Sequence, residues 1–346
     1  MKKLLLILLS VIFFNGNVFA VTLSKALLQA YNENPELNAE RENIEASKED
    51  VKISRSQFLP SVTLSASKSK ENTEKLTDRN GENSAITDAD TKIQSIDIKQ
   101  KIFQGYAGVA SLQKSKIGLN LADAKLLKTE QDILYKAVKA YSGLIFTDEK
   151  IKINQNNINL LERQVETDQA RLERGQITLA DLAQSESSLA GAQAKFILAR
   201  NEVITAKLTY EKIIGPINSL DDLDKKSDLN FEMPIDLNEA IKISKISNPN
   251  LIISKLEYEQ SEKDVTIAIS DLSPSATLSF NSSRTDDASS TINERDKETL
   301  KATISWPIFN GGKNAASLNK SKNLNNRKKL LFVNAMKTNE TNVASA

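Results

Sequence analysis

The sequence predicts a mainly α-helical fold that combines a long antiparallel coiled-coil hairpin with four amphipathic β-strands. Three observations lead to this prediction. Residues 22–126 recur in similar form as residues 236–332, and self-similarity over such a length indicates one structural unit used twice. A long segment without proline shows heptad periodicity, and four short segments alternate apolar with polar side chains.

The internal repeat defines the predicted domain boundaries. Corresponding strings in the two copies are Leu23-Ser-Lys-Ala26 with Leu237-Asn-Glu-Ala240, Asn34-Pro35-Glu-Leu37 with Asn248-Pro249-Asn-Leu251, and Ile102-Phe103-Gln-Gly105 with Ile308-Phe309-Asn-Gly311. The first copy covers residues 21–216, and an incomplete second copy covers residues 236–332. A polar linker at 217–235 joins them, and residues 333–346 form a divergent polar tail.

Residues 1–20 have the features of a secretory signal. Lys2 and Lys3 precede an apolar run from Leu4 to Phe14, and small Ala20 ends a sequence suited to cleavage. An uncleaved membrane anchor is the alternative reading of the same segment. Export across the inner membrane is therefore expected, with a mature chain that begins after Ala20.

The composition argues against several functional classes. The chain has no Cys and no His, so it lacks thiol chemistry, the commonest general base and the commonest metal ligand. Lys and Arg number 46 against 45 Asp and Glu, and this balance gives no reason to expect a nucleic-acid partner. We predict no catalysis, no cofactor and no metal site.

The first copy opens with two helices followed by strands. Thr22 is placed to cap a helix over 22–32, and Pro35 suits the first turn of a second helix that reaches about Gln57. Pro60 ends the helical pattern. Strands are predicted at about 59–68 and 93–103, and in the second copy at about 273–283 and 298–307. Alternation alone leaves open a half-buried sheet of a soluble protein.

A helical hairpin is predicted over residues 106–214. In its returning helix, large residues recur every seven positions, and mostly small residues lie three positions after each of them. The large residues are Leu182, Leu189, Phe196, Val203 and Tyr210. The outgoing helix also has an apolar residue at every seventh position: Leu112, Leu119, Leu126, Ile133 and Ala140. Gly175 is expected at the turn between the two helices.

The second copy departs from the first after Gly312. The outgoing row continues there as Leu318, Asn325, Phe332 and Asn339, so two of four apolar positions become asparagine. No counterpart of the hairpin follows. The sequence therefore predicts a truncated second copy whose last helix has lost its apolar row.

Four strings together resemble the TolC family of outer-membrane channel proteins over residues 21–332. They are the opening segment Leu23–Leu37, Phe58-Leu-Pro60-Ser, Arg171-Leu-Glu-Arg-Gly175 with Asp181-Leu-Ala-Gln184, and Trp306-Pro-Ile-Phe-Asn-Gly-Gly312. The resemblance implies a location in the cell outer membrane, with helices projecting into the periplasm. It also implies a passive exit duct that serves a tripartite efflux pump or a type I secretion system.

Strand number agrees with the assembly that the resemblance implies. Four strands per chain are fewer than the eight of small membrane barrels, so several chains must close one barrel. Family members are similar in this respect, since three protomers share a barrel. The implied partners are therefore two further copies in a homotrimer, outer-membrane lipid, a periplasmic adaptor and an inner-membrane transporter.

The resemblance assigns provisional roles to residues. Those expected to face lipid are Val62, Leu64, Ile96, Ile98, Leu278, Phe280, Ile304 and the interfacial anchor Trp306. Those expected to face the barrel lumen are Asp97, Lys99, Lys101 and Lys301. Adaptor docking is expected at the hairpin tip, at Arg171, Gly175, Thr178, Asp181 and Leu182. No residue can be assigned as a channel gate, because gate residues belong to the second hairpin.

Less specific interpretations of these residues remain as alternatives to the assigned roles. Trp306 could be an ordinary core residue, and the tip could be a plain helical turn with solvated charges. At the level of function, the alternatives are a periplasmic structural coiled-coil protein and a non-functional fragment of a channel gene. The transported substrate is not readable from the sequence.

Overall fold

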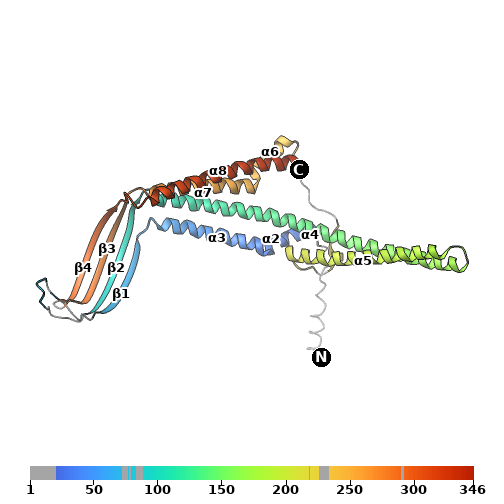
Figure 1. Ribbon diagram of the computed structural model, residues 1–346, viewed down its shortest axis with the longest axis horizontal. Coiled ribbons are helices and arrows are strands. Elements are labelled where there is room, and N and C mark those ends of the chain that lie inside the picture. The colour runs from blue at the N-terminus through green and yellow to red at the C-terminus, as the bar shows by residue number, and fades with distance from the viewer. Residues whose placement is uncertain are drawn as a thin grey trace, which may run out of the picture. The chain divides into compact units, whose positions relative to one another are not determined.

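The computed structural model describes residues 21–71, 77, 79–82, 89–217, 219–225, 234–289 and 292–346 (Figure 1). The expected signal segment, with Ala20, lies outside these residues. The helices of the first copy are α2 (Leu23–Glu33), α3 (Pro35–Ser56), α4 (Ala107–Glu173) and α5 (Leu179–Ile213), with a short 3₁₀ helix η1 (Leu220–Asp222) after them. Those of the second copy are α6 (Leu237–Ser247), α7 (Pro249–Ser270) and α8 (Lys313–Ser345).

Strands β1 (Ser61–Glu71), β2 (Ala89–Gln104), β3 (Ser275–Ser289) and β4 (Ile292–Ser305) follow the predicted pairwise order. Each strand extends further toward its connecting loop than the alternation of apolar residues predicted. Backbone pairing continues where the side chains on both faces have become polar or charged. Trp306 and Pro307 lie after β4, because a proline lacks the N–H that a sheet ladder requires.

The chain divides into two compact units. The hairpin unit contains residues 1–41 and 126–233, and the sheet unit contains residues 42–125 and 234–346. The hairpin unit therefore holds α2, the longer part of α4, α5 and the linker segment. The sheet unit holds all four strands, α6, α7, α8, most of α3 and the beginning of α4.

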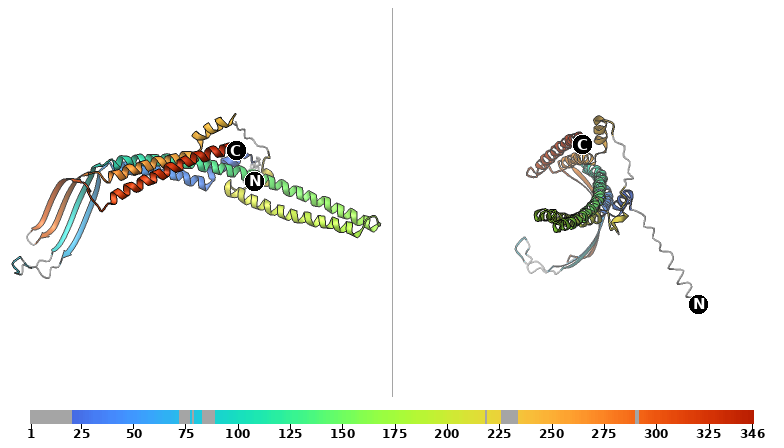
Figure 2. Two further views of the ribbon diagram at one scale, coloured as in Figure 1. Left: turned by 45° about the horizontal axis from the view of Figure 1, so that its top comes forward. Right: turned by 90° about the vertical axis from the view of Figure 1, so that its right-hand side faces the viewer.

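The hairpin unit is built on the predicted heptad seam. In Figure 1 and in the left view of Figure 2, α4 and α5 run side by side up to the turn between them. All ten seam positions of α5 are buried or half-buried, and Ala192, Ala199 and Tyr210 are among the most buried. Small side chains between large ones allow the two helices to approach closely. The coiled-coil prediction is confirmed.

The core of the hairpin unit forms where α2 and the linker pack on the hairpin. Leu23, Ala26 and Ala30 from α2 meet Ile133, Ala137 and Leu144 of α4 and Tyr210 of α5. The Tyr141 hydroxyl lies 2.8 Å from the Val21 carbonyl oxygen and 2.7 Å from that of Asp224. One phenol thus joins the start of the first copy to the linker.

The second copy's last helix is packed in spite of its asparagines. Asn325 accepts a hydrogen bond from the Ser261 hydroxyl at 2.7 Å, and the Phe332 ring stacks on Tyr258 with centroids 6.4 Å apart. Asn339, only 4% exposed, accepts from the Asn248 amide and donates to the Ser244 hydroxyl at 2.9 Å. The row loses apolar residues, as the sequence indicated, but hydrogen bonds to α6 and α7 replace the lost apolar contacts. The tail residues 333–346 continue α8 almost to the end of the chain.

Candidate functional site: a two-faced sheet and a hairpin tip

The four strands form one antiparallel sheet in the order β1-β2-β3-β4. Register fixes which residues share a face, because directly paired residues point to the same side. Val62 pairs with Ile98, which pairs with Phe280, which pairs with Leu300. The predicted lipid-facing strand residues all lie on this one face, called the apolar face below: Val62, Leu64, Ile96, Ile98, Leu278, Phe280 and Ile304.

The apolar face has no cover within the described chain. Leu64 is 77% exposed and Ile304 is 78% exposed, although a sheet buried in a soluble core would hide such side chains. Contiguous exposed apolar surface marks a membrane or protein contact. The half-buried soluble sheet is therefore the weaker interpretation of the alternation.

The opposite face is polar. Asp97 pairs with Asn281, whose amide donates to the Asp97 carboxylate at 3.0 Å. Lys99 and Lys301 both pair with Ser279, from its two sides. The fourth predicted lumen residue, Lys101, pairs with Thr277 on this same face. A bulge follows Lys101, so the register shifts by one residue before Phe103 pairs with Ala276.

The apolar face becomes charged toward the loop ends of the strands. Lys68 lies 3.2 Å from Asp90 there, and Arg284 lies 2.9 Å from Glu294. The apolar residues therefore occupy only the half of the sheet next to the helices. Sequence reasoning missed this charged half, although the alternation of charged residues at 292–298 was a signal for it.

Aromatic side chains gather where the strands join the helices. Trp306 is exposed, and its indole N–H donates to the Leu272 carbonyl oxygen at 3.0 Å. The Phe103 and Tyr106 rings meet edge to face with centroids 5.8 Å apart. Phe58 and Phe309 are exposed as well. An aromatic belt is typical of the water interface of membrane strands. Of its members, the sequence analysis gave this role to Trp306 alone.

The hairpin tip is a tight turn closed by hydrogen bonds at both helix ends. Gly175 adopts φ +73°, and its N–H donates to the Leu172 carbonyl at 2.8 Å. The Thr178 hydroxyl accepts from the Asp181 N–H at 3.3 Å, while the Asp181 carboxylate accepts from the Thr178 N–H at 2.8 Å. This reciprocal capping box starts α5. The Thr178 N–H and hydroxyl lower the pKa of Asp181.

The five predicted tip residues differ in accessibility. Arg171, Gly175, Thr178 and Asp181 are exposed, whereas Leu182 is only 5% exposed and packs within the hairpin. Leu179, which the sequence analysis did not single out, is instead an exposed apolar side chain at the tip. Its position, three residues before Leu182 and outside the seam, was the available signal.

A buried carboxylate below the tip joins the two helices. Asp168 on α4 accepts from the Ser185 hydroxyl of α5 at 2.6 Å and from the Gln164 amide at 2.8 Å. The Ser185 and Gln164 hydrogen bonds hold the pKa of Asp168 below its usual value. Arg171 lies 3.8 Å away. Sequence reasoning missed Asp168, because one acid on a charged helix gives no periodic signal.

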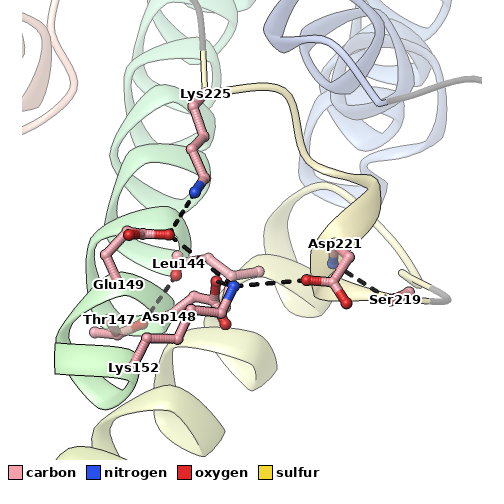
Figure 3. Close-up of polar contacts among 8 residues, drawn as sticks. All are labelled: Leu144, Thr147, Asp148, Glu149, Lys152, Ser219, Asp221 and Lys225. Carbon is pink, nitrogen blue, oxygen red and sulfur yellow. Dashed lines mark hydrogen bonds and ion pairs between the residues drawn. The ribbon is translucent and has the colours of Figure 1, made fainter. Parts of the chain in front are cut away.

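Charged residues also fasten the linker to α4 (Figure 3). Lys152 lies 2.6 Å from Asp148 of its own helix and 3.5 Å from Asp221 of the linker. Lys225 of the linker pairs with Glu149 and lowers the pKa of that carboxyl. These five residues, named the linker clasp, hold linker residues 219–225 against the hairpin.

No described helix combines the length and the apolarity that a bilayer crossing requires.

The comparisons with known proteins agree with the geometry of the sheet and hairpin. The family model "Outer membrane efflux protein" matches residues 26–216. The outer membrane efflux protein BepC of Brucella suis is 26% identical over 302 residues, and the match covers 87% of this chain and 63% of BepC. Outer membrane protein TolC of Vibrio cholerae is 24% identical over 328 residues, covering 92% and 72% of the two chains.

A solved structure shows the same fold. The outer membrane channel CmeC of Campylobacter jejuni superposes with a TM-score of 0.77 at 17% identity, over 91% of this chain and 68% of that one. BepC and CmeC are both named as outer-membrane proteins, and the outer membrane is the location that the resemblance to the TolC family implied. The chain belongs to the outer membrane efflux protein family, as the resemblance to TolC predicted.

Proposed function

We propose that this chain is a subunit of an outer-membrane exit duct that serves an efflux pump. One observation supports the proposal most directly: four long strands form a single sheet with an uncovered apolar face and a polar face. The apolar face would contact lipid, and the polar face, with Asp97, Lys99, Lys101 and Lys301, would line the lumen. The duct itself is passive, and the energy for transport comes from an inner-membrane transporter.

The assembly in this proposal is a homotrimer. A four-stranded sheet has two edges whose N–H and C=O groups need partners within a bilayer. Three copies would supply twelve strands, which lies in the size range of membrane barrels. The polar lumen of such a barrel would be lined by lysines from every copy, so it would attract anions more than cations.

The hairpin tip is the proposed docking site for a periplasmic adaptor. Its accessible residues are Arg171, Gly175, Thr178, Leu179 and Asp181, and Leu182 supports them from inside the hairpin. Leu179 offers the apolar contact, and Arg171 and Asp181 offer charges of opposite sign. A docking role needs the turn to keep its shape, which the capping box and Asp168 provide.

Drug susceptibility tests the proposed function. The chain is expressed in a Gram-negative strain that lacks its own exit duct but keeps the cognate adaptor and transporter. The proposal predicts partial recovery of resistance, and it predicts loss of that recovery in Leu179→Asp with an unchanged amount of protein in the outer membrane. The matched control is Leu198→Asp, an exposed leucine of α5 away from the tip. No recovery by a protein that reaches the outer membrane would contradict the proposal.

A further inference from the structure

The two edge strands, β1 and β4, each have an apolar part and a charged part. Along the chain, β1 runs from apolar to charged, and β4 runs from charged to apolar. On the apolar face, β1 begins with Val62, Leu64 and Ala66 and ends with Lys68 and Lys70. On the same face, β4 starts with Ile292, continues with acidic residues at 294, 296 and 298, and ends with apolar residues at 300, 302 and 304. All these side chains are exposed in the isolated chain. Within the described residues, β1 and β4 each have a strand neighbour on one side only.

These gradients discriminate between the ways in which two copies could pair. If β1 met a second β1 in a full antiparallel overlap, the apolar end of each would face the lysines of the other. Two β4 strands would likewise set apolar residues against acidic ones. An antiparallel contact between β1 of one copy and β4 of the next brings the two apolar ends together and the two charged ends together. Such a head-to-tail contact closes into a ring when it is repeated.

We propose that β1 of one copy pairs with β4 of the next in one specific register, which rests on the proposed barrel function. In this register Ser61 faces Ser305 of the partner subunit, Val62 faces Ile304, Leu64 faces Ala302 and Ala66 faces Leu300. The charged ends then match in sign: Lys68 faces Glu298, Lys70 faces Asp296 and Glu71 faces Arg295. The first two pairs lie on the apolar face and the third lies on the polar face.

The neighbouring registers are worse for identifiable reasons. A slip of one residue turns the apolar set of one strand to the polar face. A slip of two residues in one direction sets Lys68 against Leu300, and in the other direction it sets Ala66 against Glu298. Opposite charges directly across a strand pair stabilise it, and like charges or a charge against an apolar residue do not. The charged ends therefore specify the register that the apolar ends permit.

The charges at the seam are available for this role. Among the described residues, Lys70, Glu71, Arg295 and Glu298 have no ion-pair partner. Lys68 lies 3.2 Å from Asp90 on β2, and Glu298 of the partner subunit would give it a second acidic neighbour on the other side of β1. Charged edges discourage wrong sheet-to-sheet contacts before assembly. The same residues can thus keep single subunits apart from incorrect partners and select the correct one.

Disulfide mapping tests the register, and the natural chain has no cysteine to interfere. Two double variants probe the two types of ladder position, Ala66→Cys with Leu300→Cys and Ser65→Cys with Lys301→Cys. Two controls probe the slipped registers, Ala66→Cys with Ala302→Cys and Ala66→Cys with Glu298→Cys. Single variants show the background. Directly paired Cβ atoms lie within reach of a disulfide, and those displaced by two residues do not.

The outcome is measured on full-length protein oxidised in outer-membrane fractions and separated on non-reducing gels. The inference predicts covalent dimers and trimers from at least one directly facing pair, in at least five-fold excess over both slipped pairs. Preferential cross-linking of a slipped pair, or equal cross-linking of all pairs, overturns the register while leaving the barrel intact. A protein without any heat-sensitive oligomer overturns the barrel function together with the register.

Charge exchange gives an independent measurement. Lys70→Asp and Asp296→Lys should each reduce the fraction of oligomer that survives mild heating in detergent, by two-fold or more. The double variant should restore most of that fraction, because the opposite charges then face each other again. A double variant no better than the worse single variant contradicts the pairing of these two positions.

Discussion

At the scale of single residues, two asparagines at corresponding places in the two copies each join a helix end to a long helix. The Asn34 side-chain oxygen Oδ1 caps α3 by accepting from the Glu36 N–H at 3.0 Å, and the side-chain amide donates to the Ile213 carbonyl of α5 at 3.0 Å. Asn248 caps α7 by accepting from the Asn250 N–H at 2.9 Å, and its amide donates to Asn339 of α8. The Asn-Pro step of the sequence repeat is therefore a structural joint.

Removing the first joint should destabilise the hairpin unit. Asn34 is buried, so Asn34→Ala leaves the Glu36 N–H and the Ile213 carbonyl without this partner, at a cost of about 1–3 kcal/mol. The matched control is Asn32→Ala, an exposed position two residues earlier, which should stay within about 0.5 kcal/mol. Urea unfolding of detergent-solubilised protein measures both. Equal stabilities for the two variants would contradict the assigned role.

The carboxylates near the tip should make the hairpin sensitive to acid. Hydrogen bonds lower the pKa values of Asp168 and Asp181 in the folded chain. A lowered folded-state pKa stabilises the fold above the ordinary Asp pKa of about 3.9, and this stabilisation is lost as pH falls through the lowered values. Asp168→Asn should therefore unfold more easily at pH 7 and show a weaker loss of stability from pH 5 to pH 2.

Thermal melting across that pH range measures the effect, with Asp132→Asn as the control. Asp132 is an exposed acid on the same helix. Its variant should keep the acid dependence of the natural protein. If Asp168→Asn and the natural protein lost stability in parallel as the pH fell, the Ser185 hydrogen bond would not act as described.

At the scale of elements, the second copy's last helix shows how packing can survive a change of residue type. Asn325 and Asn339 occupy positions where the first copy has leucine and isoleucine, yet each finds a hydroxyl or amide partner on α7 or α6. Buried polar groups are tolerated when they are hydrogen-bonded, and they also favour one helix register over others. The pairs Lys328 with Glu257 and Lys245 with Glu340, both at 2.7 Å, support the same register.

Asn339 offers a direct test of this packing. Asn339→Ala should lower the free energy of unfolding by about 1–3 kcal/mol, because the Asn248 and Ser244 side chains would lose their buried partner. Asn334→Ala, on the exposed side of the same helix, should be close to neutral or slightly stabilising. Denaturant midpoints of both variants separate the two expectations. A neutral Asn339→Ala would mean that α8 is not held by this contact.

The elements that sequence could predict are those with a period. Heptads identified α4 and α5, Gly175 identified their turn, and alternation identified four strands and the residues that share a face. Contacts that depend on one residue meeting another across the fold gave no such signal. Asp168 with Ser185, Asn339 with Asn248 and the linker clasp belong to this class. The loop-side ends of all four strands were predicted too close to the helices, because backbone pairing continues where the apolar alternation stops.

At the scale of the whole molecule, the described chain leaves apolar surface uncovered and strand edges unpaired. Its sheet has an uncovered apolar face and two open edges, and α4 and α5 expose further apolar side chains such as Phe146, Ile153 and Leu198. A shared barrel accounts for the apolar face through lipid and for the edges through sister subunits. The polar face then becomes the wall of a water-filled passage.

Counting the copies in one particle tests this account most directly. Native mass spectrometry of protein extracted from outer membranes in mild detergent gives the number of chains per particle and shows whether detergent is bound. The account predicts a particle of three chains, released from a detergent micelle in the instrument, that falls to single chains after heating. A single chain that stays soluble without detergent would contradict it.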